Sequence, residues 1–131
     1  MSIKMPNFRH QAKPKVKPPV ELLREAARTL AQKTGGVVEG SVFTSNPGGS
    51  NLFRHTFYLR TPALNDYTYP LFYVWHDAAL YPAHLLMAGG NQQTDTQDCR
   101  TDEELREQLE EVFASPITAQ LVGALMAQAG E

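Results

Sequence analysis

Residues 52–60 alternate between two kinds of side chain, and this pattern constrains the fold more than any other feature of the sequence. A period of two is typical of a β-strand whose two faces meet different surroundings. One set is Phe53, His55, Phe57 and Leu59, and the other is Leu52, Arg54, Thr56, Tyr58 and Arg60. We therefore expect a sheet with one dry face and one face rich in aromatic rings and arginine.

Three further segments, residues 37–43, 67–76 and 81–87, are also expected to be strands, and short connections favour an antiparallel meander. Apolar residues at helical spacing predict three helices. These helices begin at Pro18-Pro19, at the capping box Thr101 to Glu104, and at Ser115-Pro116. The sequence thus predicts an α+β fold: a four-stranded antiparallel sheet, one N-terminal helix and two C-terminal helices mainly on one face. Residues 88–100 are expected to form a polar loop.

The two faces of the sheet can be assigned if Arg60 pairs with Tyr67 and if His76 pairs with Tyr81 across a four-residue loop. The face without helices then collects the tyrosines, including Tyr67, with Trp75. Tyrosine, tryptophan and arginine are enriched where proteins bind one another. The predicted protein-binding residues are Arg54, Tyr58, Arg60, Tyr69, Tyr73, Trp75 and His84. Two alternatives stay open, because a helix of the chain could cross this face and a one-residue slip would exchange the faces.

Residues 1–17 are predicted to form a basic arm rich in proline and lysine, followed by a single α+β domain over residues 18–131. Residues 1–18 carry a charge of +5, whereas residues 91–131 carry −7. The arm and the aromatic face together suggest an alternative function, binding of single-stranded nucleic acid. Its candidate residues are Lys4, Arg9, Lys13, Lys15 and Lys17. Against this alternative, residues 19–131 carry 7 positive and 14 negative charges.

The sequence predicts no catalytic, cofactor-binding or metal-binding residues. The four histidines lack the spacing of zinc ligands, and His76 and His84 are expected on opposite faces. Cys99 lies just before a predicted helix, where the helix terminus could stabilise a thiolate, although a free surface thiol is the commoner case.

We therefore expect a non-catalytic binding or regulatory protein, whose partner is another protein or a second copy of itself. No apolar run approaches the roughly 20 residues of a membrane span, and residues 1–20 lack the apolar core of a signal peptide. The single cysteine agrees with a reducing compartment. These features predict a cytoplasmic protein without a membrane partner.

Overall fold

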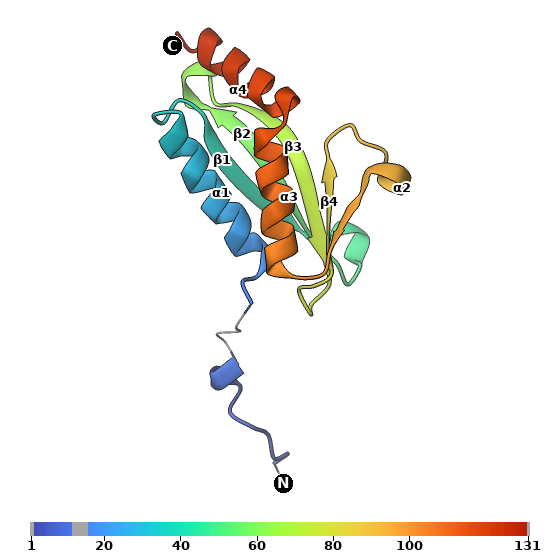
Figure 1. Cartoon of the computed structure of the whole chain (residues 1–131). Coiled ribbons are helices and arrows are strands. Elements are labelled where there is room, and N and C mark those ends of the chain that lie inside the picture. Colours follow the sequence, from blue (N-terminus) through green and yellow to red (C-terminus); the bar gives the residue numbers. More distant parts are fainter. Residues whose placement is uncertain (1, 12–15, 131) are drawn as a thin grey trace.

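A computed structural model describes residues 2–11 and 16–130 of the chain. It shows an α+β fold in which an antiparallel sheet is covered on one face by the long helices (Figure 1). The strands, which follow one another in the sheet in chain order, are β1 (Glu39–Ser45), β2 (Phe53–Thr61), β3 (Tyr67–His76), β4 (Ala83–Met87) and β5 (Gln97–Cys99). The α-helices are α1 (Pro19–Lys33), α2 (Gln92–Asp95), α3 (Asp102–Ala114) and α4 (Pro116–Gln128), and the 3-10 turns are η1 (Phe8–Gln11), η2 (Pro47–Gly49) and η3 (Pro62–Leu64).

The sheet has five strands, so the prediction of four strands is wrong in this detail. The additional strand, β5, and the short helix α2 lie within residues 88–100, which were expected to form a loop. β5 pairs with β4, with Cys99 opposite Ala83. Its sequence, Gln-Asp-Cys, has little intrinsic preference for a strand. Pairing with the edge of the sheet therefore determines this strand, and local sequence alone does not reveal it.

Side-chain caps fix the ends of the long helices. Thr101 Oγ1 accepts a hydrogen bond from the Glu104 amide at 3.1 Å, which confirms Thr101 as the N-cap of α3. The Glu104 carboxylate accepts from the Arg100 amide at 2.9 Å. At the end of α1, Thr34 Oγ1 donates to the Val38 carbonyl at 2.8 Å, which ties the helix to the segment before β1. These bonds satisfy backbone groups that the helix ends would otherwise leave without partners.

The hydrophobic core fills the space between the sheet and the helices. Phe57 and Phe72 are fully buried and stack at 5.0 Å between ring centroids, and Phe113 of α3 meets both rings edge-on at 5.5 and 6.1 Å. α1 approaches the sheet most closely at Gly40, where a β-carbon would lie 2.6 Å from the Cα atom of Ala27. A glycine at this position of β1 therefore permits the tight contact of α1 with the sheet.

The pairing of β2 with β3 contains a bulge that the predicted register lacked. Phe57 pairs with Phe72, but the next residue, Tyr58, pairs with Pro70, so Leu71 is an extra residue on β3. The extra residue reverses the alternation in the first half of β3. Tyr67 and Tyr69 consequently lie on the helix side of the sheet, beside α4.

The pairing of β3 with β4 also differs from the prediction, although without the same effect. Trp75 pairs with His84, so the connection between the two strands is longer by two residues than the predicted four-residue loop. A shift by two residues preserves the alternation. His84 therefore lies on the face opposite to the buried His76, as the sequence predicted.

Candidate functional site

The open face, defined here as the side of the sheet away from α1, α3 and α4, is built from four rows of side chains that cross the strands. Neighbouring strands lie about 4.8 Å apart and successive rows about 6.7 Å apart, so the rows cover roughly 20 Å by 20 Å. From one end to the other, the rows are Glu39–Arg60–Thr68, Ser41–Tyr58–Pro70, Phe43–Thr56–Tyr73–Leu86 and Ser45–Arg54–Trp75–His84–Asp98.

Aromatic and aliphatic side chains occupy the middle of the open face. Phe43 is 60% exposed although it lies within β1, and Tyr73 and Trp75 are half-buried. The Arg54 guanidinium lies 4.3 Å from the centroid of the Tyr73 ring, a cation–π contact that holds both side chains flat against the sheet. Leu86 is buried; it pairs with Tyr73 across the strands and lies close to Gly90 in the turn after β4. The centre is thus apolar and already well ordered.

Carboxylates contact the basic side chains at both ends of the open face. Arg60 binds two carboxylates, Glu39 and Asp66, each at 2.7 Å. At the other end, His84 Nδ1 lies 2.7 Å from the Asp98 carboxylate, and the His84 ring lies 5.6 Å from the Trp75 ring. An apolar centre with a paired, polar rim is the usual composition of a surface that binds another protein.

The structure places six of the seven predicted binding residues on the open face, namely Arg54, Tyr58, Arg60, Tyr73, Trp75 and His84. The placement of Tyr69 is wrong, because the bulge at Leu71 turns this side chain toward the core. The sequence analysis missed Phe43. Its alternation with Ser41 and Ser45 was the available signal, since small polar residues on both sides place the three on one strand face.

The candidate nucleic-acid residues do not form a common site with the open face. Lys17 pairs with Glu25 of α1 at 3.3 Å, on the helix side of the molecule. Lys4 and Arg9 are exposed, and Lys13 and Lys15 lie outside the described residues. A polyanion needs cations that carboxylates do not already neutralise. Arg60, His84 and Lys17 each already contact a carboxylate.

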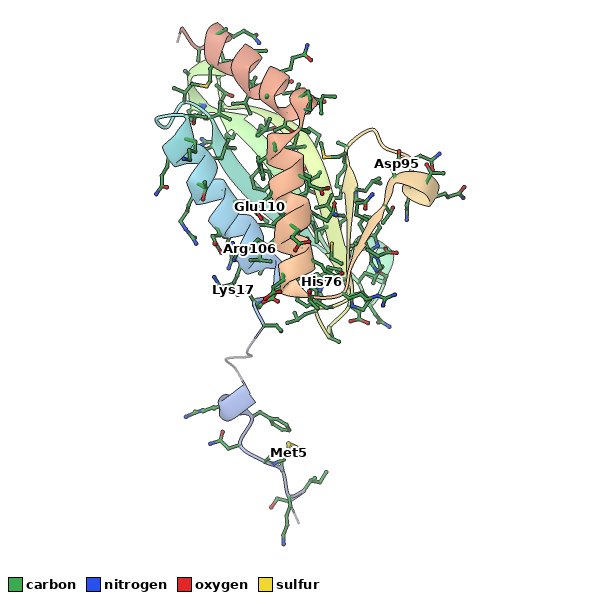
Figure 2. All side chains as sticks on the ribbon, viewed as in Figure 1. Met5, Lys17, His76, Asp95, Arg106 and Glu110 are labelled. Carbon is green, nitrogen blue, oxygen red and sulfur yellow. The ribbon has the colours of Figure 1, made fainter. Side chains whose placement is uncertain are left out.

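Two buried histidines form a hydrogen-bonded chain on the helix side, where β2 begins and β3 ends (Figure 2 labels His76). His76 Nδ1 lies 2.7 Å from the Asp77 carbonyl, which can only accept, so this nitrogen carries the proton. Neutral His76 then accepts at Nε2 from His55 Nε2–H at 2.8 Å. His55 Nδ1 in turn accepts from the Thr44 hydroxyl at 2.8 Å. With both rings neutral, these contacts assign one tautomer to each ring.

Burial lowers the pKa of His55 from 6.5 to about 4, with smaller contributions from the charges of His76 and Arg24. Protonation of both rings would bring two N–H groups face to face at the 2.8 Å contact. His55 is thus a buried structural residue whose surroundings disfavour its charged form. Among residues 2–11 and 16–130, no three His, Cys, Asp or Glu side chains gather closely enough to hold a metal ion.

Cys99 is buried under α3, so the expectation of a free surface thiol is wrong. Burial raises the pKa of its thiol to about 11, and the carboxylates of Glu104 and Asp98 contribute in the same direction. The alternative of a reactive thiolate also loses its basis, because nucleophilic cysteines have a lowered pKa and are accessible. Cys99 behaves as a small core residue that joins β5 to β4.

Comparison with known proteins adds nothing to this geometry, since no family model, no curated protein and no solved structure matches the chain. Within the part of the chain that the structure describes, no helix is both long enough and apolar enough to cross a membrane.

Proposed function

We propose that this is a non-catalytic binding protein that associates with a second copy of itself through the open face of the sheet. The observation that carries this proposal is the row Phe43–Thr56–Tyr73–Leu86, an apolar centre that the chain's own long helices leave uncovered. An antiparallel sheet with one solvated face usually has polar residues there. Here that face presents four aromatic residues, Phe43, Tyr58, Tyr73 and Trp75, and a proline.

A second copy fits the charges of the open face better than a strongly charged partner does. Arg60 has two carboxylate partners, Glu39 and Asp66, and the Asp98 carboxylate lies beside His84, so neither end presents a cluster of unpaired cations. A two-fold axis would bring the same patch of both copies together, and each contact between two different residues would occur twice, as in an isologous interface. A stable interface buries about 800 Å² per partner. The rows themselves cover about 400 Å², half of this area, so the turns that border the face would contribute the remainder.

Trp75 is the single tryptophan of the chain, so its fluorescence reports directly on the open face. We expect its emission to shift to shorter wavelength as the protein concentration rises, since the partner's sheet excludes water from the ring. Sedimentation equilibrium on the same samples measures the dimer dissociation constant. The substitutions Trp75→Ala and Tyr73→Ala should each weaken the dimer by about 2 kcal/mol, or about 30-fold.

Tyr67→Ala is the matched control for these substitutions. Tyr67 is an aromatic residue of the same strand and is 47% exposed, but it lies on the helix side. Its removal should leave the dissociation constant unchanged. A wild-type protein that stays monomeric at every accessible concentration would refute the proposal, as would equal effects of Tyr67→Ala and Tyr73→Ala.

A further inference from the structure

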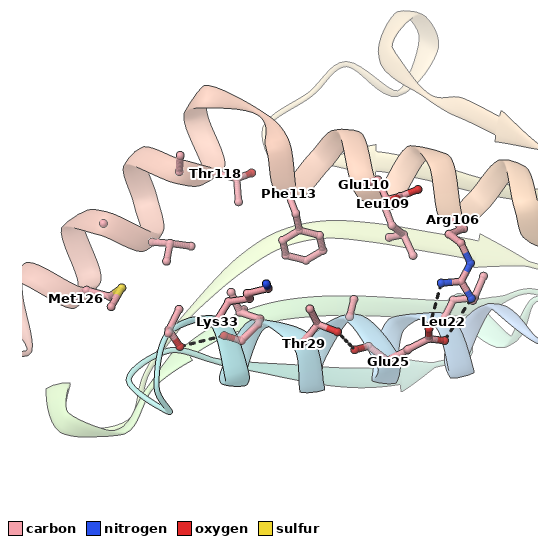
Figure 3. A pocket seen from close by; sticks show the side chains of 16 residues that line it. Leu22, Glu25, Thr29, Lys33, Arg106, Leu109, Glu110, Phe113, Thr118 and Met126 are labelled. Carbon is pink, nitrogen blue, oxygen red and sulfur yellow. Dashed lines mark hydrogen bonds and ion pairs between the residues drawn. The ribbon is translucent and has the colours of Figure 1, made fainter.

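A groove runs along the outer side of the helix layer, between α1 and the pair α3 and α4 (Figure 3). Its volume is about 630 Å³, within the range of roughly 300–1,000 Å³ that is typical of sites for bound molecules. Leu30, Phe113, Val122 and Met126 contribute apolar side chains to its walls, and α4 adds Gly123. The groove lies on the opposite side of the sheet from the open face.

The N-terminal arm carries apolar side chains in addition to its positive charges. Ile3, Met5 and Phe8 are 83%, 66% and 59% exposed, respectively, and lie close to Lys4 and Arg9. Exposure of three large apolar side chains to water is unfavourable, and a solvated tail would not require them. Exposed apolar residues gathered in one segment are typical of a segment that binds an apolar surface.

The base of this arm is fixed at one end of the groove. The Lys17 amide donates to Asp102 Oδ2 at 3.0 Å, and its carbonyl accepts from the Tyr81 hydroxyl at 2.7 Å. The Lys17 ammonium binds Glu25, which also pairs with Arg106 at 3.0 Å. Glu25 and Arg106 both line the groove, and Figure 2 shows Lys17 and Arg106 at the same end of the helix layer. The arm thus leaves the domain at the mouth of the groove.

Length and charge both permit the arm to turn back along the groove. The nine steps from Lys17 to Phe8 span at most about 30 Å, whereas α1 is about 22 Å long. Among the charged side chains that line the groove, Glu25 pairs with Arg106, and Glu110, on the acidic exposed side of α3, complements Lys4 or Arg9. Lys33 lines the groove at the C-terminal end of α1 and would repel Lys4 and Arg9. These two residues are therefore expected nearer to Glu110 than to Lys33.

We propose that the arm of each chain binds in that chain's own groove, with the side chains of Ile3, Met5 and Phe8 against Phe113, Val122 and Met126. Attachment at Lys17 makes this contact intramolecular. Short flexible connections give effective concentrations of the order of millimolar, so a modest apolar contact suffices. The groove is then a receptor for a short apolar segment with basic neighbours.

Paramagnetic relaxation in the full-length chain tests this proposal. A nitroxide label is attached to Ser2→Cys, since the native Cys99 is buried and does not compete for the label. We expect the methyl signals of Val122 and Met126 to lose intensity, and those of Leu86 on the open face to keep it. The loss should disappear with Phe8→Ser, and should diminish with added salt because the charge complementarity is screened.

Gly123→Leu fills the groove without straining the fold, since a β-carbon at Gly123 meets no atom within 4 Å. It should abolish the signal loss at Met126. The matched control is Ala127→Leu, which adds a leucine at an exposed position of the same helix that does not line the groove. This variant should retain the loss.

A mixed sample separates the chain's own arm from that of a second copy. It combines nitroxide-labelled chains with isotope-labelled chains that carry no nitroxide. Loss of the Val122 and Met126 signals in the isotope-labelled chains of this mixture would show that the arm of one copy binds the groove of another, and would overturn the intramolecular proposal. Unchanged signals of these residues in a chain that carries its own nitroxide at position 2 would overturn it as well. Neither result bears on the open face, which Trp75 fluorescence tests independently.

Discussion

The buried pair of His55 and His76 predicts a specific loss of stability in acid. In the folded protein, His55 titrates with a pKa of about 4, whereas the unfolded chain titrates at the ordinary value of 6.5. Because the folded pKa is depressed, the unfolded state binds more protons between these two values, and the free energy of unfolding falls as the pH falls. The stabilisation is complete above pH 6.5 and is lost progressively toward pH 4.

The size of the effect follows from linkage. A shift from 6.5 to about 4 removes about 3 kcal/mol once the pH reaches 4. At pH 5 the loss is already about 2 kcal/mol, a substantial part of the total stability of a small domain. Urea denaturation across this pH range, at one fixed protein concentration, measures the change directly.

The comparison variant is His55→Gln, because a glutamine amide can still donate to His76 Nε2 but does not titrate. We expect the wild-type free energy of unfolding to fall more steeply between about pH 7 and pH 5 than that of the variant, by about 2 kcal/mol. His84→Gln is the control, since it removes an imidazole from the open face and leaves the buried pair intact. Nitrogen NMR of the rings should also show the proton on Nε2 of His55 and on Nδ1 of His76. Parallel pH dependence in wild type and His55→Gln would refute the assignment.

Two further predictions concern the packing of the core. Gly40→Ala should destabilise the fold by about 3 kcal/mol or more in urea denaturation. The new methyl group would lie 2.5 Å from Phe57 Cζ and 2.6 Å from the Cα atom of Ala27. The control Gly123→Ala should be neutral or stabilising, because a β-carbon there meets no atom within 4 Å. The Cys99 thiol should react with an aromatic disulfide reagent far more slowly in the native protein than in urea, since it is buried and its pKa is raised to about 11; equal rates would contradict this placement.

Alternation along the strands was sufficient to predict most of the sheet. β3 has the bounds that the sequence predicted, Tyr67–His76, and Tyr73 and Trp75 share a face with Arg54. The reason is physical: a strand with one buried face cannot slip by one residue without exposing its apolar side chains. Slips by two residues preserve this alternation. Where the predicted pairings were displaced by two residues, as at Phe72–His76 of β3 and in β4, the faces were predicted correctly.

The bulge at Leu71 is where alternation alone failed, although the sequence contained a signal for it. Pro70 has no amide hydrogen to donate, and β3 is a central strand. Proline within a central strand is confined to a bulge or to the strand's first residue. The position of Pro70 thus indicated an irregular ladder and a change of face for Tyr69. The additional residue moves two tyrosines from the open face to the core side.

The groove and the histidine pair depend on distances that no local pattern encodes. The sequence placed His55 on the dry face, but its contact with His76 requires the true register of β2 and β3. The groove likewise exists only because α1 and the α3–α4 pair leave a space between them. Helix stripes predict which residues face the sheet, and they do not predict how far apart neighbouring helices lie.

The open face and the groove lie on opposite sides of one sheet and share no residue. A substitution in one of them should therefore leave the function of the other intact. If two chains associate through their open faces, both grooves and both arms lie on the outside of the dimer. Trp75→Ala should then release the dimer while the arm stays in its groove, and Gly123→Leu should expel the arm while the dimer persists. Loss of both properties in one variant would indicate a damaged fold rather than a damaged surface. The uncovered aromatic row and the groove are therefore two independent surfaces, each with an occupant that its own side chains specify.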